Sequence, residues 1–208
     1  MNHETIYKNG CYHIRAAELL ASSNYFGFAI AHLILGGEEL IKYQVALYHH
    51  RVPSPFTDFQ LKAIFSSHKE KHKFWKQHQH AVSDGFSNEY VSAMFSDLTG
   101  KPLTDQDRIA LENVFRQTST FFKLIADQIR LTSSDYMSFL EWIKTADRQK
   151  QEGFYVQSNG TTPEGFQQSD YEMVRKYVAA LESQSENALQ VFTDMLKMFT
   201  DEDNSRTD

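Results

Sequence analysis

The chain has 208 residues, of which 41% are hydrophobic and 23% charged, a composition typical of one packed domain and not of a disordered chain. Its net charge of -6 excludes a protein that coats nucleic acid with its whole surface, so any nucleic-acid site must be local. The single cysteine, Cys11, excludes an internal disulfide, and no N-terminal stretch has the pattern of a secretion signal. The most apolar window, 25–37, is too short for a membrane span. We therefore expect a cytoplasmic protein with no membrane association.

The spacing of apolar residues predicts an all-α fold. Only 4 prolines and 9 glycines interrupt the sequence, and between them apolar residues recur every three or four positions. Helices are expected over 11–22, 25–49, 57–80, 104–131, 134–151 and 169–199, with a proline break at 52–55 and a weak segment at 88–97. A capping box of Ser169 and Glu172 is expected to open the last helix. These elements predict a bundle of about six helices in one domain, 1–200, with an irregular, partly β-prone insertion near 153–165 and a disordered polar tail, 201–208.

The expected second helix is apolar nearly all round, which predicts a central, buried element. Near its end, Glu38 and Glu39 lie four and three residues before Lys42, so both carboxylates can reach one ammonium. One interpretation is an ordinary ion pair at a solvent-facing helix end. The other is a functional site, because charges buried among apolar neighbours are costly unless they are paired.

The expected third helix carries a local excess of positive charge. Between 60 and 80 only Glu70 is acidic, whereas the basic and imidazole side chains are Lys62, Lys69, Lys71, Lys73, Lys76, His68, His72, His78 and His80. The apolar face of this helix, continued at helical spacing, reaches His68 and then His72. Either these two histidines are hydrogen-bonded core residues and the lysines a solvated face, or the segment lines a basic groove.

Metal and nucleophile motifs do not match. In His68-Lys69-Glu70-Lys71-His72 the acid stands one position later than in the zinc-protease motif, and no Glu is followed three residues later by His as in di-iron bundles. Glycine-rich phosphate loops and serine elbows are also missing. A clip of two histidines completed by Glu38 or Glu39 stays geometrically open, but no metal or other cofactor is expected.

The end of the expected fifth helix offers a third feature. Its cations, among them Arg148 and Lys150, are followed by a short aromatic piece that contains Tyr155. Such cations often only stabilise a helix C-terminus. Alternatively, they could hold a phosphate while Tyr155 stacks on a base.

Taken in order, these motifs resemble the AbiV family of abortive-infection phage-defence proteins, within the HEPN superfamily of helical bundles. The resemblance spans about 15–163 and is carried by the following segments: Ala16-Ala17-Glu18-Leu19-Leu20, Asn24-Tyr25, Glu38-Glu39-Leu40-Ile41-Lys42, Ser67-His68-Lys69-Glu70-Lys71, and Arg148 through Gly153-Phe154-Tyr155-Val156. The usual superfamily signature, an Arg followed after a short spacer by a His, is missing, because neither Arg15 nor Arg51 has a histidine at that distance.

The resemblance implies a homodimeric effector that arrests translation or phage multiplication when a phage-encoded activator protein engages it, with a metal-independent endoribonuclease as the expected activity. RNA cleavage needs a base, an acid and cations that stabilise the phosphorane. Glu38, Glu39, Lys42, His68 and Lys71 are the expected catalytic residues, with His68 as acid or base. Lys69, His72, Arg148 and Tyr155 are expected to bind RNA. The alternative is a non-enzymatic module whose basic groove sequesters RNA, a ribosomal element or a phage protein.

Overall fold

The computed structural model describes residues 2–51, 57–83, 131–155 and 165–204. Within these ranges the chain forms seven helices and no strand, which confirms the all-α prediction. The predicted proline break at 52–55, the weak segment at 88–97 and all but the last residue of the helix predicted over 104–131 lie outside the described residues, as does most of the predicted insertion. None of the helices in the described ranges combines the length and apolar character of a membrane span.

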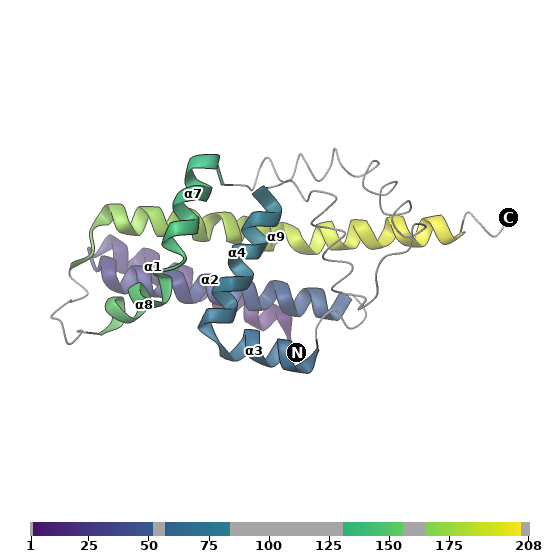
Figure 1. The fold of residues 1–208 in the computed structure, drawn as a ribbon, viewed down its shortest axis with the longest axis horizontal. Coiled ribbons are helices and arrows are strands. Elements are labelled where there is room, and N and C mark those ends of the chain that lie inside the picture. The colour runs from purple at the N-terminus through teal and green to yellow at the C-terminus, as the bar shows by residue number, and fades with distance from the viewer. Residues whose placement is uncertain (1, 52–56, 84–130, 156–164, 205–208) are drawn as a thin grey trace.

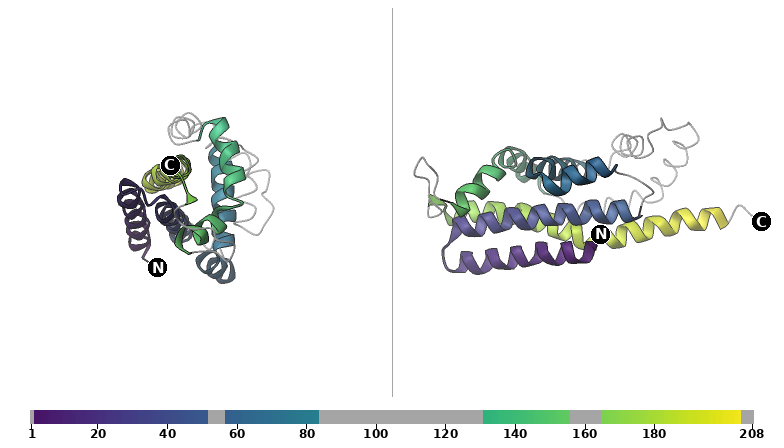
Figure 2. Two further views of the ribbon diagram at one scale, coloured as in Figure 1. Left: turned by 90° about the vertical axis from the view of Figure 1, so that its left-hand side faces the viewer. Right: turned by 90° about the horizontal axis from the view of Figure 1, so that it is seen from below.

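Two long helices form the axis of the molecule. In Figure 1, α2 (Phe26–Arg51) and α9 (Gln168–Asn204) run side by side along its length. Figure 2 shows α1 (His3–Ser22) on one side of α2, and α4 (His68–Ser83) with α7 (Ser133–Trp142) on the other. Two shorter helices, α3 (Asp58–Ser66) and α8 (Ala146–Phe154), also contact α2. The prediction of a central, buried second helix is confirmed.

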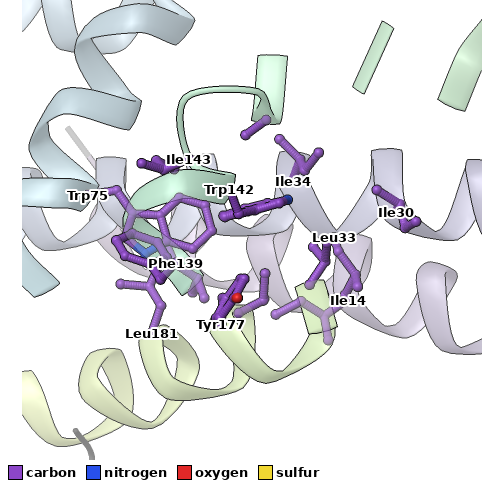
Figure 3. Packing of buried hydrophobic residues seen from close by; sticks show 14 of the residues in the cluster. Ile14, Ile30, Leu33, Ile34, Trp75, Phe139, Trp142, Ile143, Tyr177 and Leu181 are labelled. Carbon is purple, nitrogen blue, oxygen red and sulfur yellow. The ribbon is translucent and has the colours of Figure 1, made fainter. Parts of the chain in front are cut away.

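The core is rich in aromatic side chains. Trp75 from α4, Phe139 and Trp142 from α7, and Tyr177 from α9 contact one another with ring centroids between 5.2 and 6.0 Å apart (Figure 3). Each large buried ring removes about 150–250 Å² of surface from water. This cluster fixes α4 and α7 against α9 and so holds one wall of the site described below.

Several helix boundaries differ from the predicted ones. The first helix begins at His3, not Cys11, because the side chain of Asn2 accepts from the Thr5 amide as its N-cap, and Gly10 lies inside the helix at a close crossing with Gly36. The last helix begins at Gln168, where the predicted capping box of Ser169 and Glu172 is wrong. Instead, the amide of Gln167 donates to the Asp170 carboxylate.

Two of the predicted helices are each two helices. The helix predicted over 57–80 breaks at Ser67, whose Oγ accepts from the Glu70 amide at 3.3 Å and so caps α4. The helix predicted over 134–151 breaks after Trp142, where the amide and hydroxyl of Thr145 both donate to the Trp142 carbonyl. Gly153, expected to begin an irregular insertion, is still within α8, and the extended backbone starts at Tyr155.

Two glycines let α4 and α8 approach α2 closely. A Cβ on Gly37 would overlap the Trp75 ring, and a Cβ on Gly153 would overlap the Gly27 carbonyl oxygen. Gly37 directly precedes Glu38, and Gly153 lies one helical turn after Lys150. Close packing at these crossings therefore sets the distance between the side chains that form the site.

Replacing Gly153 with Ala should destabilise the protein. The added methyl group would meet backbone, which cannot move aside as a side chain could, so we expect a loss of about 1–3 kcal/mol of unfolding free energy in urea titrations. Gly165→Ala is the control, because nothing lies within 4 Å of its Cβ position. Equal urea midpoints for the two variants would show that the helix crossing tolerates a methyl group.

Candidate functional site

The site is centred on the carboxylate of Glu38, which is 1% exposed. Its Oε2 is 2.6 Å from Nδ1 of His68 and 2.9 Å from Nζ of Lys71. Its Oε1 is 2.7 Å from Nζ of Lys150 and 3.1 Å from Nε2 of His72. One carboxylate on α2 is thus held by two side chains of the first turn of α4, one further side chain of α4 and one of α8. We call these five residues the Glu38 cluster.

The buried position of Glu38 depends on this charge compensation. Burial alone would raise the pKa of the carboxyl, but hydrogen bonds from His72, Lys150 and Lys71 outweigh it and hold the pKa well below its usual range. The N-terminus of α4, capped by Ser67, adds the positive end of a helix dipole on the same side. Glu38 is therefore an anion in the folded protein, and removing it would leave Lys71 as a buried, unpaired cation and Lys150 with Asp147 as its remaining carboxylate partner.

His68 is the member of the cluster that reaches solvent, since 45% of its side chain is exposed. Its Nδ1 faces inward, 2.6 Å from Glu38 and 2.7 Å from Nζ of Lys150, whereas its Nε2 makes no hydrogen bond to the described residues. When Nδ1–H donates to Glu38, Nε2 is a free base. When Nδ1 accepts from Lys150, the neutral ring carries its proton on Nε2 and donates a hydrogen bond there. At its open edge the ring can thus act as a base in the first form and as a hydrogen-bond donor in the second, and it becomes an acid once both nitrogens carry a proton.

The predicted catalytic residues divide into two groups. Glu38, His68 and Lys71 come together, and so does His72, which was expected to bind RNA but is buried. Glu39 and Lys42 pair with each other instead, on the wall of α2 whose charges act on His13 of α1. The expectation that both carboxylates reach Lys42 is wrong for Glu38, because side chains of α4 and α8 hold the Glu38 carboxylate instead.

The remaining predicted RNA-binding residues lie outside the Glu38 cluster. Lys69 is exposed on α4. Arg148 has 69% of its side chain exposed and lies 3.8 Å from Glu152, and Tyr155 is 63% exposed. These three residues are accessible, but none touches Glu38.

From the sequence, Lys150 was predicted only as one of the cations at the end of a helix. The buried face of α8 consists of Ala146, Lys150 and Gly153, so one lysine stands between two small residues. Small residues one turn apart are typical of a helix that packs closely against a neighbour, and a lysine on that face must find a buried anion. The pattern of a lysine between two small residues could therefore have identified Lys150 as a buried residue of the site from the sequence.

One group of side chains has the composition of a metal site. Single ligand atoms of Glu38, His68 and Asp147 all lie within 4.8 Å of one another. Nζ of Lys150, however, contacts all three residues, at 2.7 Å from Glu38, 2.7 Å from His68 and 3.1 Å from Asp147. An ammonium already occupies the place that a cation would take, so the arrangement favours proton chemistry over metal binding.

Comparison with known proteins identifies one family. The family model described as AbiV, in the HEPN class, matches residues 3–186, a range that contains every member of the Glu38 cluster. Neither the curated proteins nor the solved structures gave a match.

Glu38→Gln should destabilise the protein by about 3 kcal/mol or more at pH 7, because it leaves the buried ammonium of Lys71 without an anion and that of Lys150 with Asp147 alone. The lowered pKa of Glu38 means that its contribution is full above the unfolded value of 4.5 and is lost as the pH falls below it. The difference between wild type and variant in urea titrations should therefore shrink between pH 6 and pH 3. Glu141→Gln, which removes the exposed partner of Lys144, should change stability by about 0.5 kcal/mol at most. A Glu38→Gln protein as stable as this control would contradict the assignment.

Proposed function

The chain belongs to the AbiV family of abortive-infection phage-defence proteins, and from this premise we propose that it is a metal-independent endoribonuclease that arrests translation in infected cells. The observation that carries the proposal is the half-exposed imidazole of His68, whose inner nitrogen is anchored by a buried carboxylate. A carboxylate behind an imidazole fixes the orientation of the ring and stabilises its charged form, as in other sites of acid–base catalysis.

The proposed reaction breaks one phosphodiester bond. Nε2 of His68 removes the proton of a ribose 2′-hydroxyl, and the resulting oxygen attacks the adjacent phosphorus. The bond from phosphorus to the 5′ oxygen then breaks, and that oxygen takes a proton from water at the open edge of the site. The hydroxide ion that remains takes the proton from Nε2 of His68, which returns the ring to its starting form. The products are a 2′,3′-cyclic phosphate and a 5′-hydroxyl end. No metal ion or cofactor enters this balance.

Within this proposal the buried members of the cluster are positioning residues. Lys71 and Lys150 have at most 5% of their side chains exposed, so they act on RNA through His68 and do not touch it. Lys150 competes with Glu38 for Nδ1 of His68 and thereby influences which tautomer is present at Nε2. The proposal keeps a homodimer and a phage-encoded activator as its partners, and a monomeric mass in light scattering at micromolar concentration would contradict the dimer.

Sequestration is the second candidate function, and the burial of the cluster favours it. With Glu38, Lys71 and His72 almost inaccessible, only His68 presents a reactive edge. A protein that inhibits by occupancy would need no more than an accessible binding face. New RNA ends at particular positions in arrested cells support cleavage, whereas intact ribosomal, transfer and messenger RNA support sequestration.

His68→Ala should lower the rate of RNA cleavage by at least about 100-fold, because loss of an acid–base group removes a contribution of that size. The assay incubates purified protein with total bacterial RNA and the phage activator, with and without EDTA, and maps the ends produced. Gln77→Ala is the control, since Gln77 is an exposed polar residue of the same helix outside the cluster. Unchanged cleavage by a folded His68→Ala protein, or its loss in EDTA, would refute the proposed chemistry.

A further inference from the structure

The lysines of the described residues fall into two classes. Six of them form ion pairs with carboxylates: Lys8, Lys42, Lys71, Lys144, Lys150 and Lys176. Among the lysines whose side chains the structure describes, those that make no ion pair with a described residue lie on α3 and α4, namely Lys62, Lys69, Lys73 and Lys76. Apart from Arg15 on α1, the cations without a carboxylate partner among the described side chains are thus concentrated on one pair of adjacent helices.

Three of these lysines form a line on α4. Lys69, Lys73 and Lys76 follow one another at four and three residues, which places them within a narrow angle on one side of the helix. All three are exposed, whereas Lys71 and Trp75 of the same helix are buried. At 1.5 Å per residue, the line of Lys69, Lys73 and Lys76, which we call the α4 lysine stripe, is about 10 Å long. Figure 2 shows α4 on the side of the bundle opposite α1.

A proposed catalytic residue lies near one end of the α4 lysine stripe, and a pair of aromatic rings lies near the other end. Next to Lys69 in the first turn is His68, the proposed catalytic residue. Four residues beyond Lys76 on the same side is His80, an exposed ring that lies nearly parallel to the ring of Tyr136 of α7, with an interplanar angle of 11°, centroids 6.3 Å apart and Nδ1 2.9 Å from the Tyr136 hydroxyl. Aromatic rings beside a row of cations are typical of surfaces that hold single-stranded nucleic acid, because bases stack while phosphates meet the cations.

We infer that the α4 lysine stripe binds the phosphate backbone of a single-stranded RNA and guides it toward His68, with His80 and Tyr136 as a stacking platform for a base. The inference rests on the proposed function for its choice of RNA as the polyanion. An acidic protein segment would satisfy the lysines but would make no use of the stacked rings. Because lysines contact phosphates and aromatic rings stack on any base, binding is expected to depend on charge and to show little sequence preference.

The salt dependence of binding follows from the number of phosphates neutralised. Three contacts on a single strand give a slope of log affinity against log salt of about -2, which corresponds to an affinity about 20-fold weaker in 200 mM than in 50 mM salt. Removing the three charges should abolish that part of the slope. A structural role for the same lysines would leave the slope unchanged.

The test compares full-length wild type with a triple variant, Lys69→Gln, Lys73→Gln and Lys76→Gln, by fluorescence anisotropy with a labelled 2′-O-methyl oligonucleotide of mixed sequence. This probe has the RNA backbone but lacks the 2′-hydroxyl, so cleavage cannot distort the measurement. The control triple variant, Lys8→Gln, Lys144→Gln and Lys176→Gln, makes the same change of net charge at exposed lysines that have acidic partners.

We expect the stripe variant to bind more weakly than wild type at 50 mM salt and to lose about 2 units of slope, so that its deficit relative to wild type is about 20-fold smaller in 200 mM than in 50 mM salt, while the control variant keeps the affinity and slope of wild type. Equal losses of probe affinity in the two variants would overturn the inference, because they would reflect net charge alone. Unchanged binding of the probe by the stripe variant would also overturn it, even if that variant had lost binding to an acidic phage protein. The His68→Ala protein separates this inference from the proposed function. If it binds the probe like wild type and still cleaves RNA, the cleavage chemistry is wrong and the stripe stands.

Discussion

The structure depends on the compensation of one buried negative charge. Glu38 would be costly in the interior of the bundle if it were alone, and it is tolerated because two ammonium groups and two imidazoles from α4 and α8 surround it. Two glycine crossings bring those helices close enough to α2 for direct contact. The Glu38 cluster therefore couples the packing of three helices to the placement of one reactive side chain, and the same interaction that ties the helices together also orients His68.

Much of the architecture could be predicted from periodicity, and the places where prediction failed have identifiable causes. The central helix was predicted nearly to its ends because its apolar residues surround the whole helix. The break at Ser67 was missed because apolar spacing continues across it, from Ile64 to His68, as if one helix ran through. The serine followed three residues later by Glu70 was the local sign of a new helix start.

The site was predicted only in part, because the sequence does not show which side chains the fold brings together. Glu38, His68 and Lys71 were identified by their charge in an apolar or basic context, but sequence gave no means of deciding that Glu38 turns toward α4 while Glu39 turns toward Lys42. That choice follows from how α2 is rotated in the bundle. Lys150 was placed elsewhere because it lies 112 residues from Glu38, and only the docking of α8 brings the two together. Contacts of such separation are a property of the tertiary fold.

The distance along the chain between Glu38 and Lys150 has a consequence for biosynthesis. During translation, the segment that carries Glu38, His68 and Lys71 leaves the ribosome well before α8 has been made. Until then the carboxylate lacks one of its two ammonium partners and the imidazole lacks one neighbour at Nδ1, so the complete constellation exists only in a nearly finished polypeptide. The cluster on which the proposed activity depends is thus completed only after most of the protein's own message has been read.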